Sequence, residues 1–397
     1  MFLSVFINYV DRGNLSIAAP MLKDEFKLSG SQLGILLSSF FWTYAGFQII
    51  SGWLVDRFDV KWVMATGFFL WSGATAVTGV LHGFAILLVA RLLLGAGESV
   101  AYPSYSKILA RDFPEEQRGF ANSVIVAGQT GGPGFGMFAG GMLMARFGWR
   151  SFFVVIGLVS LLWLWPWLKL MPRGGRIVIH QLAPMPSLGE ILQQRSAWGT
   201  CGGLFCTNYL SYFLLTWLPF YLVRERHFSM DNMAKIAGSA FLTAALTAMV
   251  CGKISDHWIA SGGTATRVRK TFTTAGMIVA AVFLFGCVVS GPRLAIFMLI
   301  MAAMGFGICC SNLWAITQTL AGPQAAGRWT GVQNFVGNLA GIVAPALTGF
   351  VLDRTGQFFW PFVIAAAFCV AGAMCWIFVV GQVRPVQWRI KAEATTA

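Results

Sequence analysis

Apolar runs of about 20 residues recur along the whole chain, and this pattern limits the possible fold more than any other feature. A run of that length crosses the hydrocarbon core of a bilayer as an α-helix, which satisfies its backbone hydrogen bonds internally. Only 11% of the 397 residues are charged and 57% are hydrophobic, whereas a soluble domain has roughly a quarter charged residues. We therefore predict an all-α polytopic membrane protein surrounded by a lipid bilayer.

Charge, proline and glycine interrupt the apolar runs often enough to predict twelve transmembrane helices. The predicted spans are 1–22, 31–54, 62–81, 83–107, 119–145, 149–170, 197–223, 234–259, 271–290, 292–319, 328–352 and 358–381. The first run has no basic segment before it, so it does not resemble a signal peptide. It also leaves no residues for a cytoplasmic tail, so we expect either a truncated start or an initiation codon later than the natural one.

One polar segment rich in proline and glycine, 171–196, divides the chain into two sets of six spans. It predicts an N-terminal bundle at 1–170, a cytoplasmic central loop at 171–196, a C-terminal bundle at 197–381 and a cytoplasmic tail at 382–397.

The two sets of spans also repeat short motifs. Gly52-x-x-x-Asp56 follows span 2, and Gly252-x-x-x-Asp256 follows span 8, 200 residues later. Arginine opens both span 5 and span 11, at Arg118 and Arg328. These repeats predict two pseudo-symmetric six-helix bundles, the arrangement of transporters whose halves rock around a central site.

Spans 5 and 11 each carry a small residue or proline at every fourth position: Gly128, Gly132, Gly136 and Gly140 in the first, and Gly337, Gly341, Pro345 and Gly349 in the second. Residues four apart share a helix face and let another backbone approach closely. Two interpretations stay open: ordinary tight helix packing, or a sliding contact between the two halves.

Basic residues account for the net charge of +13, and their placement decides what that charge means. They lie mostly in the gaps between spans, more of them on the side of the two termini, as the positive-inside rule expects for cytoplasmic loops. We therefore predict a multi-pass protein of the cell (inner) membrane with both termini cytoplasmic. No basic helix face is present, so no nucleic-acid partner is expected.

Four charged residues fall inside predicted spans: Asp11 and Arg12 in span 1, and Arg91 and Glu98 in span 4. Burying all four unpaired would cost on the order of 10 kcal/mol. Asp11 and Arg12 are adjacent and point about 100° apart, and about 10 Å of helix rise separates Arg91 from Glu98. Neither helix can neutralise itself, so we predict ion pairing between spans 1 and 4 around a shared hydrated cavity.

The chemistry of these four groups suggests a function. Arginine stays charged at any working pH and presents a planar fork to a carboxylate, so Arg12 and Arg91 can hold an anionic substrate. Burial favours the protonated form of a carboxyl group, so Asp11 or Glu98 can load and release a proton. The constellation favours a proton-coupled anion carrier; the alternative is a static ion-pair lock between two helices.

Four motifs carry a family resemblance: "NYVDRGNLSIAAP", "GWLVDRFDVKW", "RLLLGAGESVAYPSYSKI" and "GVQNFVGNLAGIVAPALTGFVLDRTG". With them the chain resembles the major facilitator superfamily, within its anion:cation symporter family, and most closely bacterial galactonate, glucarate and hexuronate transporters. The resemblance implies the major facilitator fold and a monomer. It also implies alternating access with proton-coupled uptake of a small organic anion, a sugar acid such as an aldonate, aldarate or uronate.

The same resemblance implies roles for individual residues. Asp11 and Glu98 would carry protons, and Arg12 and Arg91 would contact the substrate carboxylate. The residues that would hydrogen-bond to the hydroxyl groups of the substrate are Tyr9, Tyr44, Gln129 and Asn334. The wall of the second half would include Ser311, Asn312 and Trp314. For these last seven residues, interhelical hydrogen bonding or packing is the alternative.

In "GWLVDRFDVKW" the resemblance implies a cytoplasmic gate. The gate residues would be Gly52, Asp56, Arg57, Lys61 and Arg118, with Arg57 and Lys61 in exchangeable ion pairs. Asp59 occupies a position where the family usually has glycine. This departure predicts that the loop differs from its usual shape. The second copy, "GKISDHWIASGGTATRVRK", is looser, and we interpret it as a positive-inside anchor.

Other functions receive less support. Span 7 contains no basic residue, whereas organophosphate exchangers of this fold place an arginine there. A receptor or scaffold of the same fold would not need the four intramembrane charges. The four histidines are scattered, the eight cysteines show no CxxC spacing, and no phosphate-cradling GxxxxGK[ST] occurs. We therefore expect no enzyme activity, no metal and no cofactor, with a proton gradient as the energy source.

Overall fold

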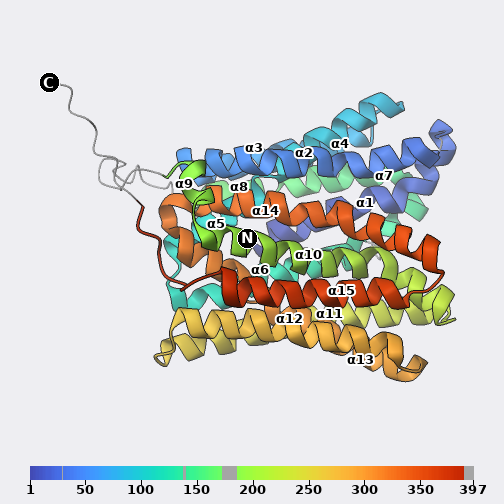
Figure 1. Ribbon diagram of the computed structural model, residues 1–397. Helices are drawn as coiled ribbons and strands as arrows, with labels where there is room; N and C mark the ends of the chain where they lie inside the picture. Colours follow the sequence, from blue (N-terminus) through green and yellow to red (C-terminus); the bar gives the residue numbers. More distant parts are fainter. Residues whose placement is uncertain (29, 137–139, 172–185, 389–397) are drawn as a thin grey trace.

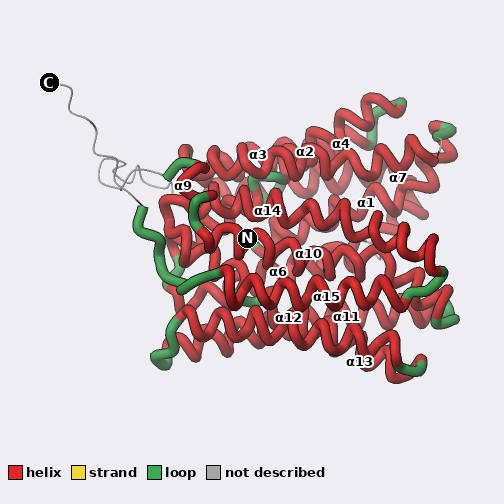
Figure 2. The backbone as a smooth tube through the Cα atoms, viewed as in Figure 1, coloured by secondary structure: helices red, strands yellow, loops and turns green. Residues whose placement is uncertain are grey.

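The computed structural model describes residues 1–28, 30–136, 140–171 and 186–388. These residues form a bundle of long helices that run side by side along one axis, joined by short turns, and no strand occurs among them (Figures 1 and 2). The predicted all-α class is confirmed.

In the first part of the chain the described residues form these helices: α1 Phe2–Phe26, α2 Gly30–Arg57, α3 Val60–Thr78, α4 Phe84–Glu98, α5 Ala101–Asp112, α6 Glu115–Phe135, α7 Gly141–Leu161 and α8 Leu164–Leu170. The pair α4 and α5 forms one continuous membrane-length stretch, Phe84–Asp112. Gly148 interrupts α7 with φ of +79°, a conformation that glycine adopts without strain. That break lies in the gap predicted between spans 5 and 6.

The second part begins with the short helix α9 Leu188–Leu192 and continues with α10 Arg195–Phe220, the π-helical turn Tyr221–Glu225, α11 Met230–Ala260, α12 Ala265–Val289, α13 Pro292–Cys310, α14 Leu313–Thr355, α15 Phe359–Met374 and the π-helical turn Cys375–Val379. Gly322 breaks α14 with φ of +63°, in the gap predicted between spans 10 and 11. Within the predicted central loop and tail, residues 172–185 and 389–397 lie outside the described residues.

Six stretches of the described helices are long and apolar enough to cross a membrane by length and composition. Other long helices, such as α1 and α6, contain polar residues that lower their mean hydropathy. Large apolar side chains face outward on several helices: Phe69, Leu162 and Val282 are each more than 60% exposed. A bundle that is apolar outside and polar within suits lipid rather than water.

The small-residue stripes of the sequence pack inside each half. A Cβ on Gly132 of α6 would lie 2.8 Å from the Phe6 carbonyl oxygen of α1. In the second half, a Cβ on Gly337 of α14 would lie 2.6 Å from Leu204 of α10. Each stripe therefore brings the fifth span of its half against the first. Ordinary tight packing is the correct interpretation, and the sliding contact between halves is wrong.

Other glycines bring the two halves together. A Cβ on Gly52 of α2 would lie 2.6 Å from the Gly327 carbonyl oxygen of α14. A Cβ on Gly252 of α11 would lie 2.8 Å from the Gly119 carbonyl oxygen of α6. Helix backbones thus touch along two seams, α2 with α14 and α6 with α11.

Candidate functional site

Two helices of the first half supply the charge cluster formed by Asp11, Arg12, Arg91 and Glu98. Arg12 of α1 donates from Nε to Oε2 of Glu98 of α4 at 2.8 Å, and Glu98 is fully buried. The predicted ion pairing between the first and fourth spans is confirmed. Asp11 is also buried, and its Oδ1 accepts a long hydrogen bond of 3.4 Å from Asn14.

Aromatic rings enclose the Arg12 guanidinium. Its carbon lies 4.2 Å from the ring centroid of Tyr44, 4.5 Å from that of Tyr9 and 5.1 Å from that of Phe40. Tyr9 precedes Arg12 by three residues on α1, so the two share a helix face. The electron-rich faces stabilise the cation and hold the guanidinium in one orientation.

Arg91 completes the cluster. Its guanidinium carbon lies 5.3 Å from the ring centroid of Phe40, and the side chain is within electrostatic range of Glu98, Asp11 and Arg12. Nε of Arg91 and Nη2 of Arg12 are buried without a hydrogen-bond partner. Oδ2 of Asp11 and Oε1 of Glu98 are likewise buried without a partner, so the cluster leaves both donors and acceptors unused. The unused guanidinium donors can bind an anion, because a buried, unsatisfied charged donor is costly.

Tyr102 and Gln129 belong to the first half and form a hydrogen bond with each other. Tyr102 of α5 donates its hydroxyl to Oε1 of Gln129 of α6 at 2.6 Å. The Tyr102 ring also packs against Trp314 of α14, with centroids 5.3 Å apart. Trp314 therefore contacts the first half here, and its place in the substrate wall stays a prediction.

The second half contributes a chain of neutral polar side chains. Tyr212 of α10 packs against Phe41 with ring centroids 6.2 Å apart and lies within electrostatic range of Arg12. Its hydroxyl donates to Oδ1 of Asn338 at 2.8 Å, and Nδ2 of Asn338 donates to Oδ1 of Asn334 at 3.0 Å. Nδ2 of Asn334 is buried without a partner.

Two of these residues were missed by sequence reasoning. Asn338 follows the predicted Asn334 by one helical turn, so the i, i+4 rule could have found it. Tyr212 carries no comparable signal, because it is one of several aromatic residues in its span.

Ser311 and Asn312 make their hydrogen bonds away from the charge cluster. Nδ2 of Asn312 donates to the Ser311 hydroxyl at 2.7 Å, and Oδ1 of Asn312 accepts from Nη1 of Arg269 at 2.6 Å. The structure therefore groups this pair with Arg269, at one end of the bundle. Their contact with substrate stays a prediction.

Asp56 joins α2 to α14 at that same end, which we call the latched end and define by Asp56, Glu115, Asp256 and Arg328. The two Asp56 carboxylate oxygens accept from the backbone N–H of Gly327 at 3.0 Å and of Arg328 at 2.7 Å. Nζ of Lys107 lies 3.6 Å from Oδ1 of Asp56. The predicted gate residues Gly52 and Asp56 thus lie at a contact between the halves.

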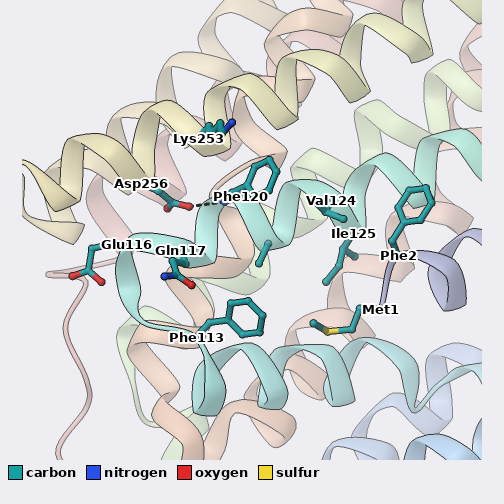
Figure 3. Close-up of a pocket in the computed structure, with 11 residues that line it drawn as sticks. Met1, Phe2, Phe113, Glu116, Gln117, Phe120, Val124, Ile125, Lys253 and Asp256 are labelled. Carbon is teal, nitrogen blue, oxygen red and sulfur yellow. Dashed lines mark hydrogen bonds between the residues drawn. The ribbon is translucent and has the colours of Figure 1, made fainter. Parts of the chain in front are cut away.

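Asp256 repeats this arrangement on the other seam. Its oxygens accept from the backbone N–H of Gly119 at 3.0 Å and of Phe120 at 2.7 Å, the latter drawn in Figure 3. Nη1 of Arg269 lies 2.8 Å from Oδ1 of Asp256, and Nε of Arg269 lies 3.3 Å from Oε1 of Glu115. The looser second motif is therefore a latch and not merely a positive-inside anchor. The signal was the repeated Gly-x-x-x-Asp spacing.

The remaining predicted gate residues differ in their contacts. Arg118 donates to Glu115 at 2.8 Å and to the Thr319 hydroxyl of α14 at 3.3 Å, so it crosses between the halves. Lys61 donates to the Met171 carbonyl oxygen at 2.7 Å rather than to a carboxylate, and Arg57 is exposed. Among the described residues, Lys61 therefore forms no ion pair in this conformation, unlike the expectation.

Asp59, the departure from the family pattern, has a local explanation. It is the N-cap of α3, and its Oδ1 accepts from the backbone N–H of Lys61 at 2.9 Å. An aspartate cap satisfies a helix N-terminal donor, so the loop keeps a defined shape without glycine.

A cavity of about 490 Å³ lies at the latched end, lined by apolar side chains of α6 such as Phe120 and Val124 and bordered by Lys253 of α11 (Figure 3). It does not coincide with the charge cluster. The hydrated chamber around that cluster remains an expectation.

A two-part helical bundle with an apolar exterior, a buried charge cluster and latches between its parts defines a membrane transport protein. The model of the Major Facilitator Superfamily matches residues 1–345, and the chain belongs to that family. As a member of this family, the chain is a transporter and not an enzyme.

Named relatives cover nearly the whole chain. The hexuronate transporter of Bacillus subtilis (strain 168) is 30% identical over 401 residues, which span 97% of this chain and 94% of that protein. The probable galactarate/D-glucarate transporter GudP of the same strain is 27% identical over 417 residues, spanning 97% and 91%.

Solved structures agree on the fold. The crystal structure of the transporter FucP in the outward conformation superposes with a TM-score of 0.78, at 15% identity, over 96% of this chain and 98% of that one. The chain therefore has the major facilitator fold.

Proposed function

We propose that this protein is a proton-coupled symporter that takes up a sugar acid by alternating access. Support comes first from the relatives that are named as a hexuronate transporter and as a probable galactarate/D-glucarate transporter. The observation that carries the proposal is the Arg12–Glu98 ion pair at 2.8 Å, with Arg91 beside it and guanidinium donors left unpartnered.

Charge balance supplies the coupling. Arg12, Arg91, Asp11 and Glu98 sum to zero when both acids are ionised. Entry of a monoanion would leave one uncompensated negative charge in a buried site, at a cost of roughly 2.5–3.5 kcal/mol or more. Uptake of one proton by Asp11 or Glu98 restores neutrality. Anion and proton therefore bind cooperatively, and each raises the affinity for the other.

The latches supply alternating access. In our proposal the latched end faces the cytoplasm, together with both termini, and the inner membrane is the site of function. Closing the Asp56 and Asp256 latches opens the site to the outside, and releasing them opens it to the cytoplasm. Gly52, Arg118 and Lys61 would act in this gate, with the protein working as a monomer.

Uptake into proteoliposomes tests the proposal. With the lumen more alkaline than the outside, the wild-type protein should accumulate labelled galactonate or galacturonate. Glu98→Gln should lose gradient-driven accumulation but keep exchange, and Arg91→Ala should lose binding. Glu25→Gln is the matched control, because Glu25 lies outside the charge cluster. Its Oε1 pairs with Nη2 of Arg150 at a distance of 2.8 Å.

Two outcomes would count against it. Normal accumulation by Glu98→Gln would show that Glu98 does not carry the coupled proton. Wild-type exchange that ignores the pH gradient would instead identify an organic anion exchanger of the same fold.

A further inference from the structure

Among the described residues, both cations of the charge cluster come from one half of the protein. Arg12 and Arg91 belong to α1 and α4, and both lie against Phe40. The second half presents Tyr212, Asn338 and Asn334 instead, which are linked by hydrogen bonds and carry no charge.

The basic residues of α10 and α14 cannot supply the missing charge. Arg195 donates to the Phe378 carbonyl oxygen at 3.0 Å, and Arg328 bonds to the Pro186 carbonyl oxygen. The guanidinium carbon of Arg354 lies 4.4 Å from the ring centroid of Phe350. Arg195 and Arg354 lie at helix ends and Arg328 lies six residues after the break at Gly322, and each of the three makes its contact outside the charge cluster.

The neutral side chains suit hydroxyl groups. A side-chain amide has both hydrogen-bond donors and an acceptor, and a hydroxyl group can pair with either. Nδ2 of Asn334 and both amide atoms of Gln48 are buried without a partner. Gln48 follows Tyr44 by one turn of α2, so it extends the aromatic side of the Arg12 site toward the latched end.

Resting on the proposed function, we infer that the site selects sugar acids with a single carboxylate, aldonates and uronates, over the doubly charged aldarates. One carboxylate is held at Arg12 and Arg91. The far end of the carbon chain then lies against amides and hydroxyls, where a second carboxylate is buried without a cation. An unpaired buried charge is costly, whereas a hydroxyl at that position is satisfied.

Binding of a matched series tests this inference. Galactonate, galacturonate and galactarate share one carbon skeleton and differ in charge and ring closure. Titration calorimetry of the full chain in detergent at pH 7 should give galactarate a Kd at least about tenfold above that of the better monoacid. Equal or tighter binding of galactarate would overturn the inference and leave the proposed function standing. No binding of any of the three would overturn both.

A substitution makes the test reciprocal. Asn338→Lys places a cation on the neutral wall and should improve galactarate binding at least about tenfold relative to galactonate. Asn338→Gln keeps a neutral amide and should keep the wild-type ranking. If Asn338→Lys folds and the ranking stays unchanged, the neutral wall does not set the charge preference; if it fails to fold, the wild-type series decides.

Discussion

The Gly52–Gly327 contact is the seam at which a single methyl group should change the conformational equilibrium. In Gly52→Ala, the new Cβ would lie 2.6 Å from the Gly327 carbonyl oxygen and 3.0 Å from the Arg328 Cα. Both are backbone atoms, so no side-chain rotation relieves the clash. The helices α2 and α14 must separate, and the hydrogen bonds of Asp56 to Gly327 and Arg328 must lengthen.

The expected magnitude follows from the cost of overpacking, typically about 1–3 kcal/mol. Only the latched conformation bears this cost, because the contact exists only while the halves meet at this end. The ratio of unlatched to latched protein should therefore rise roughly 5- to 150-fold. Gly46→Ala is the matched control on α2, since a Cβ there meets nothing within 4 Å.

Hydrogen exchange measured by mass spectrometry can follow the seam directly. Opening exposes the N–H groups that Asp56 and Asp256 hold, so peptides spanning 115–124 and 323–332 should both exchange faster in Gly52→Ala. Both should respond because each half moves as a body. Exchange in Gly52→Ala that matches Gly46→Ala at both peptides would refute the assignment of this seam as a gate.

Three further predictions involve four substitutions. Asp256→Asn should raise hydrogen exchange at 115–124 as strongly as Asp56→Asn raises it at 323–332. Each substitution removes a carboxylate that accepts two backbone N–H groups. Unchanged exchange in Asp256→Asn would show that the motif around Asp256 is only a positive-inside anchor. Asp59→Ala should lower the stability of α3 by about 0.5–2 kcal/mol through loss of its N-cap, visible as a lower Tm, and an unchanged Tm would contradict the cap's role. Hydrogen bonds from Arg150, then Trp149, lower the pKa of Glu25 below its ordinary value of 4.5, so their stabilisation is full above pH 4.5 and is lost as pH falls through the lowered pKa. Glu25→Gln should remove that acid-sensitive part of the Tm profile, and identical profiles would show that the pair adds nothing.

Much of the fold was predictable because lipid imposes one requirement on every span. Apolar runs of sufficient length become helices, and glycine marks where the chain turns, as at Gly148 and Gly322. The Arg12–Glu98 pair was predictable for a related reason, since two isolated helices could not neutralise their own charges.

Contacts between helices were harder to predict. A periodic stripe shows which side of a helix packs closely but does not name the helix that covers it, so the stripe of Gly132 was open to two interpretations. The aromatic enclosure of Arg12 combines residues of α1 and α2 whose relative height depends on tertiary packing. Asn312 was placed in the substrate wall by resemblance, although its amide bonds to Arg269.

The most direct test of the central claim is to count protons that enter with the substrate. Proteoliposomes held at zero membrane potential and containing a pH-sensitive dye should acidify inside when galactonate or galacturonate is added outside. One proton should enter with each monoanion, and Glu98→Gln should abolish the signal. Substrate entry with no accompanying change in lumenal pH would contradict a site in which Arg12, Arg91, Asp11 and Glu98 link anion binding to protonation.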